Sequence, residues 1–114
     1  MEADLYATLR VSDFARARAW YERLLGDVAF DAHATESVWM VGASRGIAVV
    51  EHDAPGNGTV TLFCADLDAA LAEIAQRGRL APAETETYSN GVRKAIFRDA
   101  DGNEIGFGGA PVAA

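Results

Sequence analysis

Hydrophobic and polar residues alternate over short stretches of this chain, and two longer stretches have helical spacing. Residues 5–11, LYATLRV, place a hydrophobic side chain at every second position, which is typical of a half-buried strand. Residues 13–26 then repeat hydrophobic positions at helical spacing, between an aspartate that can cap a helix and a glycine that can end it. The pattern therefore predicts a strand that is followed directly by a helix.

Further short hydrophobic runs are separated by turn-forming residues such as GASRG, SNG and DADG. These runs predict more strands and a second helix. The strands are expected at residues 28–33, 37–41, 47–52, 60–64, 80–88, 92–98 and 103–108, and the helix at residues 66–77.

The second half of the chain repeats the order of the first. A shift of 53 residues places Asp13 on Asp66 and Tyr21 on Ile74, within two strand-plus-helix stretches of similar pattern. A single βαβββ unit is too small to bury the face of its own sheet, so the two units must pack against each other or against a second chain. We therefore expect an α+β fold in which residues 1–114 form one domain. Its two βαβββ modules are expected at residues 1–53 and 59–114, with a linker at residues 54–58.

Composition excludes several classes of partner. Ten basic residues against 17 acidic residues give a net charge of −7, which argues against nucleic acid, because phosphate binding needs clustered positive charge. No hydrophobic run approaches the roughly 20 residues that span a membrane. The start of the chain lacks the features of a signal peptide, so a cytoplasmic location is expected. The single cysteine, Cys64, is expected to be a small buried residue and not a nucleophile.

Two segments resemble a known family. LRVSDFARARAWYERLLG at residues 9–26 and GVRKAIFRDADGNEIGF at residues 91–107 resemble the opening and closing segments of a glyoxalase/bleomycin-resistance/extradiol-dioxygenase module, the vicinal oxygen chelate superfamily. Ala100 stands where the family most often has proline in DPDGN. The resemblance implies paired βαβββ modules whose strands curve into a cup, and it implies two chains around two sites. It leaves open whether modules pair within one chain or between two.

The resemblance also implies a divalent metal, held by His, Gln or Glu side chains from four strands. The corresponding positions in this chain are Tyr6, Val49, Thr59 and Gly106. None of them carries the imidazole or carboxylate that such metals require. We therefore expect neither a metal nor another cofactor, and no catalytic residue.

The cup would instead be lined by aromatic and charged side chains. Strand alternation places Tyr6 and Arg10 on the cup face. Aligning the two hairpins so that Trp39 corresponds to Ile96 and Met40 to Phe97 places Trp39 on the same face and Met40 beneath the helices. Such a mixture suits a small molecule with an aromatic or hydrophobic body. The expected ligand-binding residues are Tyr6, Arg10, Trp39, Val49, Glu51, Phe63, Ile96, Glu104 and Gly106.

Three functions are consistent with these features. The leading hypothesis is a metal-independent homodimer that sequesters an aromatic or glycopeptide-like antibiotic, or another hydrophobic metabolite. The second is an enzyme. It would be a lyase, isomerase or dioxygenase whose metal ligands are displaced, for example to Glu51 or Glu104, or a metal-free variant that uses Tyr6, Arg10 or Glu51. The third is a structural module whose cup is filled by its own side chains.

Overall fold

Eight strands and two helices follow one another in residues 1–112, the part of the chain that the computed structural model describes. Their order is the one that the hydrophobic pattern predicts, although the expected strand at residues 80–88 is shortened to four residues. The elements are β1 (Leu5–Val11), α1 (Phe14–Leu25), β2 (Phe30–His33), β3 (Glu36–Gly42), β4 (Arg45–Glu51), β5 (Thr59–Cys64), α2 (Leu67–Gly78), β6 (Glu84–Thr87), β7 (Arg93–Arg98) and β8 (Glu104–Gly109).

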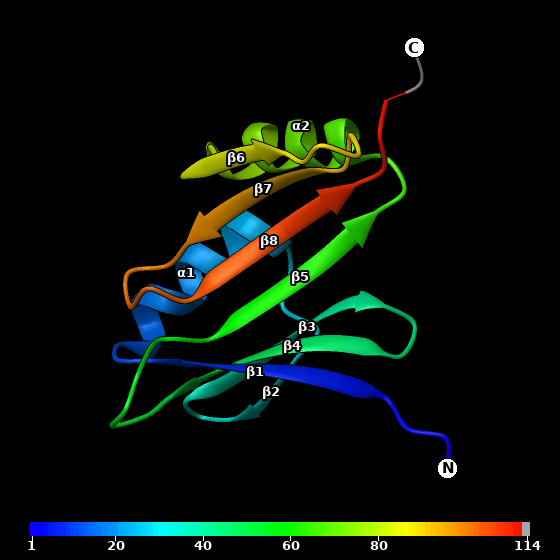
Figure 1. The fold of residues 1–114 in the computed structure, drawn as a ribbon. Helices are drawn as coiled ribbons and strands as arrows, with labels where there is room; N and C mark the ends of the chain where they lie inside the picture. Colours follow the sequence, from blue (N-terminus) through cyan, green and yellow to red (C-terminus); the bar gives the residue numbers. More distant parts are fainter. Residues whose placement is uncertain (113–114) are drawn as a thin grey trace.

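The strands form two four-stranded mixed sheets with the same topology. The first sheet has the order β1-β4-β3-β2 and the second has the order β5-β8-β7-β6. In each sheet the strand before the helix pairs in parallel with the last strand, and the other pairs are antiparallel. Figure 1 shows the two sheets side by side, with both helices behind them. The α+β fold of two βαβββ modules is thus confirmed.

Both helices begin at the aspartates that the repeat aligns. The Asp13 carboxylate accepts a hydrogen bond from the Arg16 backbone N–H at 3.1 Å, and the Asp66 carboxylate accepts one from the Ala69 N–H at 3.0 Å. α1 ends at Gly26, whose φ of 92° favours glycine. Each helix has 12 residues, and no helix within residues 1–112 is long and apolar enough to cross a membrane.

The two modules share one hydrophobic core. Both helices and the helix-facing sides of both sheets contribute to it, and its largest side chain, Trp39, is completely buried. The sharing follows from size, because neither sheet of four strands could bury its face with one helix. The core consists of Leu9, Val11, Ala17, Tyr21, Leu24, Trp39, Ile47, Val49, Leu67, Ile74, Ala95, Phe97, Ile105 and Phe107.

The expected alignment of the two hairpins is wrong by a single position. The parallel pairing of the first strand in each module sets Ile47 of β4 against Ile105 of β8. Trp39 pairs with Ile47 and Phe97 pairs with Ile105, so Trp39 corresponds to Phe97 and not to Ile96. A slip of one residue moves every side chain of a strand to the other face of the sheet. The expected faces of β3 and β4 are therefore reversed.

Three expected cup residues consequently face the helices. The Trp39 ring lies 5.8 Å from the Tyr21 ring, and its Nε1 donates a hydrogen bond to the carbonyl of Gly26 at 3.0 Å. Val49 is fully buried in the same core. The Glu51 carboxylate accepts a hydrogen bond from a backbone N–H at the start of α1. Met40, expected beneath the helices, lies on the opposite face and is partly exposed.

A buried polar cluster joins the modules where β1 ends and β5 begins. The Asn103 side chain donates to the carbonyl of Arg10 at 2.8 Å and accepts from the N–H of Gly58 at 2.8 Å. It also donates to Asp99, which accepts a further bond from the Tyr21 hydroxyl at 2.7 Å. Burial raises the pKa of Tyr21 far above its usual range, and the adjacent Asp99 charge raises it further. We call Tyr21, Asp99 and Asn103 the polar hub.

Candidate ligand-binding site

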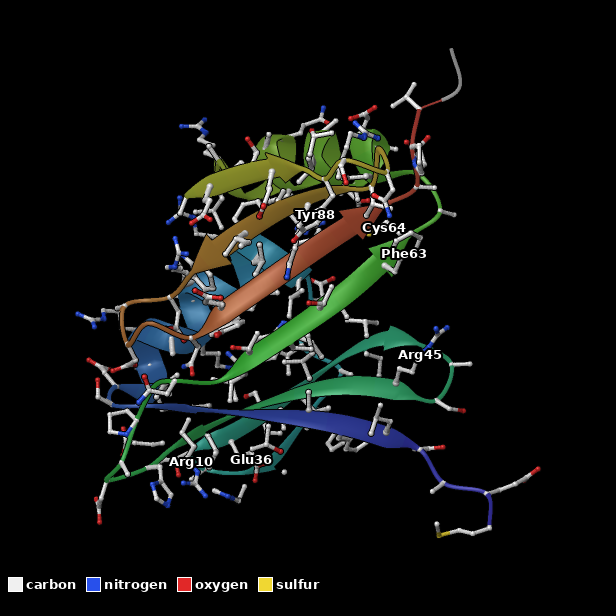
Figure 2. All side chains as sticks on the ribbon, in the orientation of Figure 1. Arg10, Glu36, Arg45, Phe63, Cys64 and Tyr88 are labelled. Carbon is white, nitrogen blue, oxygen red and sulfur yellow. The ribbon has the colours of Figure 1, made fainter. Side chains whose placement is uncertain are left out.

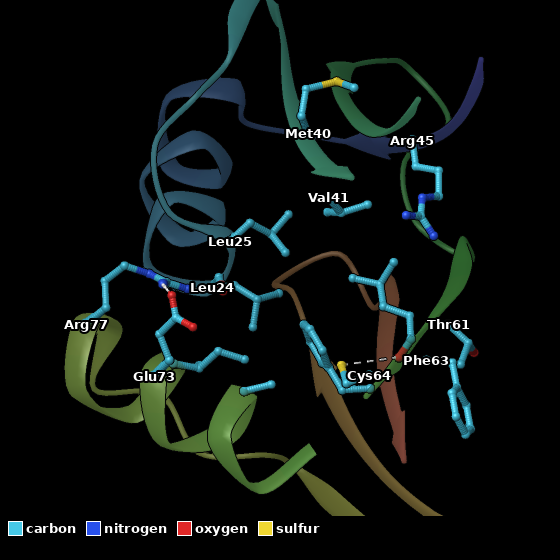
Figure 3. A pocket seen from close by; sticks show the side chains of 14 residues that line it. Leu24, Leu25, Met40, Val41, Arg45, Thr61, Phe63, Cys64, Glu73 and Arg77 are labelled. Atoms are coloured by element: carbon cyan, nitrogen blue, oxygen red, sulfur yellow. Dashed lines mark hydrogen bonds and ion pairs between the residues drawn. The ribbon is translucent and has the colours of Figure 1, made fainter. Parts of the chain in front are cut away.

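A cavity of about 600 Å³ lies between the modules, where β1 begins and β5 ends. Its volume is in the range of about 300–1,000 Å³ that is typical of small-molecule pockets. Side chains of both helices, of β5, of β8 and of the turn between β3 and β4 surround it (Figure 3). They are Leu24, Leu25, Met40, Val41, Arg45, Thr61, Leu62, Phe63, Cys64, Ala70, Glu73, Ile74, Arg77 and Phe107.

Ten of the 14 residues that line the cavity are apolar, and polar groups share the exposed wall with them. Leu24 comes from the last turn of α1, Ile74 faces it from α2, and both are buried. The Phe107 ring contributes from β8 and stands edge-on to Phe97, with ring centres 5.6 Å apart. These side chains belong to the shared core or pack against it, so the cavity is an opening in a rigid framework. A molecule that filled it would exchange water for aliphatic and aromatic carbon.

One pair of charges at the cavity is already engaged. Arg77 bonds to Glu73 at 3.1 Å, and its Nη2 donates to the carbonyl of Leu24 at 2.6 Å. Carbonyls in the last turn of a helix lack partners within that helix, so Arg77 satisfies one of them at the end of α1. Figure 3 shows the Arg77–Glu73 pair at the side of the cavity formed by α2. Arg77 therefore holds α1 to α2, and Glu73 pairs with it on its own helix.

Cys64 lies in the cavity wall and is partly buried. Its Sγ lies 3.8 Å from the carbonyl of Leu62. Burial raises the pKa of the thiol above its ordinary value. At neutral pH the sulfur is therefore protonated and behaves as a polarizable apolar group.

The remaining expected residues are spread over what we call the open faces, the sides of the two sheets turned away from the helices. The strand register places Tyr6 and Arg10 on the open face of the first sheet. The register places four further expected residues on the open face of the second sheet, namely Phe63, Ile96, Glu104 and Gly106. Figure 2 shows Arg10 and Phe63 at well separated places on the molecule. Of the nine expected residues, only Phe63 lines the cavity.

An ion-pair network occupies part of the second open face. Arg98 contacts Glu84 at 2.8 Å and Glu104 at 3.1 Å. These hydrogen bonds, first to Glu84 and then to Glu104, raise the pKa of the Arg98 guanidinium. The Glu104 carboxylate is therefore ion-paired with Arg98, a residue of its own sheet.

The donor set that the family implies for a metal does not fit here. With the hairpins aligned as the strand register requires, the four positions are Tyr6, Ala48, Thr59 and Gly106, and Ala48 replaces Val49 in that role. None of these residues carries an imidazole or a carboxylate. Within residues 1–112, no group of three or more His, Cys, Asp or Glu side chains is placed to hold a metal ion.

Lys94 fills the space in front of Gly106. A Cβ atom at Gly106 would lie 2.6 Å from Lys94 Cε and 3.5 Å from its ammonium nitrogen, so a larger side chain at this position would displace Lys94. The positive charge of the Lys94 ammonium would also repel a metal cation bound at this place. The residues present thus do not fit a metal centre.

The fold defines a protein of the paired βαβββ class. The chain belongs to the glyoxalase/bleomycin resistance protein/dioxygenase superfamily, whose sequence profile matches residues 5–107. No curated protein sequence is significantly similar to it.

Solved structures extend this assignment. A glyoxalase/bleomycin resistance protein from Catenulispora acidiphila DSM 44928 is 43% identical, with a TM-score of 0.90, over 96% of this chain and 100% of that one. TnmS3, an antibiotic binding protein from Streptomyces sp. CB03234, is 27% identical, with a TM-score of 0.73, over 96% of this chain and 97% of its own. A bleomycin resistance determinant encoded on the transposon Tn5 is 18% identical, with a TM-score of 0.75 over 97% and 100% of the two chains, which shows a shared fold.

Sequence reasoning missed most of the cavity. Its residues come from the end of α1, the end of β3, the start of β4, one face of α2, β5 and β8, and they share no single period along the chain. Met40 could have been found by aligning the hairpins correctly. The others depend on how the modules pack, which local patterns do not encode.

Proposed function

We propose that this protein binds a small, largely apolar molecule in the cavity between its modules, without metal and without altering it chemically. The observation that carries the proposal is the cavity of about 600 Å³ with aliphatic and aromatic walls. Because this cavity is open, it supports a ligand-binding function and not a structural module whose cup is filled by its own side chains. The disagreement between the donor set and a metal centre favours binding over metal-assisted catalysis.

The comparisons suggest the kind of molecule. TnmS3 is described as an antibiotic binding protein and is 27% identical to this chain over nearly its whole length. We therefore propose an aromatic or otherwise hydrophobic antibiotic, or a metabolite of similar character, as the ligand. Protection of the cell would come from sequestration alone.

We further propose that the protein works as a homodimer. Two exposed apolar side chains meet on the first open face, Tyr6 at 43% and Met40 at 37%, and both lie over Gly46. Exposed apolar patches of this kind mark sites of association. We therefore propose that a second copy of the chain covers these side chains.

A pair of phenylalanine substitutions on α2 tests the proposed site. Ala70 lines the cavity, whereas Ala72 is exposed on the same helix and lies outside it. Binding of N-phenylnaphthylamine, a neutral apolar dye, is followed by its fluorescence. Ala70→Phe should weaken binding about tenfold or more by filling the cavity, a loss of roughly 1.4 kcal/mol. Ala72→Phe should bind as the wild type does.

Melting curves of both variants control for folding. Equal affinity of folded Ala70→Phe and wild type would show that the dye binds elsewhere, and would overturn the proposal. Absence of dye binding to the wild type would do the same.

A further inference from the structure

We propose that the cavity selects amphipathic anions, with an apolar body between the modules and an acidic group bound by the Arg45 guanidinium. The inference rests on the proposed function and gives the ligand a chemical class. The acidic group would be a carboxylate, sulfonate or phosphate, each of which offers oxygens to a guanidinium.

Arg45 is placed to meet such a group. It begins β4, directly after the turn from β3, and it lines the cavity together with Val41 and Phe63. Figure 3 shows its guanidinium extending from the turn toward the cavity, across from Thr61 and Phe63. A ligand whose body lies among the aliphatic walls would present one end to this cation.

The charge of Arg45 is not used within the protein. None of the ion pairs found in residues 1–112 involves it, and neither does any of their side-chain hydrogen bonds. The other charged groups at the cavity, Glu73 and Arg77, bond to each other. In the described part of the chain, the cavity therefore carries one uncommitted charge, and that charge is positive.

Gly42 helps to set the position of the guanidinium. A Cβ atom at Gly42 would lie 2.5 Å from Arg45 Nε and 2.6 Å from its Nη2. The guanidinium therefore rests against the backbone of β3, at a place that only glycine leaves free. Arg45 is solvent-exposed, and this packing shortens its reach and places its donors beside the cavity.

Electrostatics makes this placement selective. The chain has a net charge of −7, so an anion gains nothing from the protein as a whole. The exposed Arg45 guanidinium borders the apolar side chains of the cavity, which keep water from one side of its contact with an anion. An acidic ligand should thus be preferred over a neutral one of the same shape.

A matched pair of dyes tests the inference. Anilinonaphthalene sulfonate carries a sulfonate on the same skeleton as the neutral N-phenylnaphthylamine. Arg45→Met keeps much of the aliphatic stem and removes the charge. The variant should bind the sulfonate about threefold to fivefold more weakly, as expected for loss of one charged contact at an exposed site, and should bind the neutral dye as before. Arg10→Met, at an exposed arginine on the first open face, is the control and should change neither affinity.

Gly42→Ala provides a second variant that retains the positive charge. Its Cβ would displace the guanidinium from the backbone of β3, so the sulfonate should bind more weakly than to wild type but more strongly than to Arg45→Met. The neutral dye should be unaffected.

Three results would overturn the inference. If Arg45→Met binds both dyes as the wild type does while Ala70→Phe still excludes the neutral one, the site stands and the anion selectivity falls. If Arg10→Met loses the sulfonate instead, the acidic group lies on the open face. If neither dye binds the wild type, the inference and the proposed function fall together.

Discussion

The boundary between the two modules has a closed end and an open end, and the two differ in how their polar groups are used. At the closed end, the fully buried Asn103 side chain bonds to the carbonyl of Arg10, to the N–H of Gly58 and to Asp99. Asp99 in turn accepts a bond from Tyr21 of the first module. At the open end, apolar walls surround a cavity and Arg45 has no partner in the described residues. One end of the boundary thus stabilises the fold, whereas the other is left available for a ligand. The difference predicts that substitutions at the closed end cost stability and that substitutions at the open end alter binding.

The largest expected effect concerns Trp39, in the core that both ends share. Trp39→Ala removes a fully buried ring and its hydrogen bond to Gly26, and should lower the free energy of unfolding by about 3–5 kcal/mol. Tyr6→Ala on the open face should cost far less. Urea denaturation measures both. A mild effect at Trp39 would contradict its place in the core.

The closed end is broken directly by Asn103→Ala. The substitution leaves the N–H of Gly58 without its partner and removes one of the two bonds accepted by the carbonyl of Arg10, which keeps the N–H of Gly56, and it should cost about 1–3 kcal/mol. Arg45→Met at the open end should change the free energy of unfolding by no more than about 0.5 kcal/mol. Equal losses in urea denaturation would remove the distinction between the two ends.

Tyr21→Phe sharpens the comparison through pH. Loss of the hydrogen bond to Asp99 should cost about 1–2 kcal/mol at neutral pH. The pKa of the Tyr21 hydroxyl is raised in the folded protein. As pH rises, the hydroxyl therefore loses its proton at a lower pH in the unfolded chain than in the folded one. The stability contributed by the hydroxyl is therefore present below the ordinary pKa of about 10 and declines above it. Denaturation at several alkaline pH values should show a steeper decline for wild type than for Tyr21→Phe, and parallel curves would contradict this.

The smallest expected effect is on the reactivity of Cys64 at the open end. Because burial raises the pKa of its thiol, reaction with a disulfide reagent should be severalfold slower at pH 7.5 than that of a free thiol. The rate should rise at a higher pH than it does for that free thiol. N-phenylnaphthylamine in the cavity should slow the reaction further, and labelling at an unchanged rate with the dye bound would place the dye elsewhere.

Local patterns predicted the elements and much of the open faces. The aspartates Asp13 and Asp66 marked both helix starts because their carboxylates cap free N–H groups. Alternation placed Phe63 and Gly106 on the correct face, whereas Trp39 was assigned to the wrong face by a slip of one residue. The pattern could not reveal the slip, because the sequence of β3, ESVWMVG, has hydrophobic side chains on both faces of its strand.

The cavity could not be predicted in this way. It lies between surfaces of two modules, so it depends on the distance and angle at which α1 and α2 pack. Those are set by contacts such as that between Arg77 and the carbonyl of Leu24, 53 residues apart. No local period reports such a contact.

A crystal structure of the protein with N-phenylnaphthylamine bound tests the central claim most directly. The account predicts electron density for the dye between α2 and the β3–β4 turn, in contact with Leu24, Ala70 and Phe107. Density on the open faces alone, with the cavity filled by water or by a second chain, would contradict it.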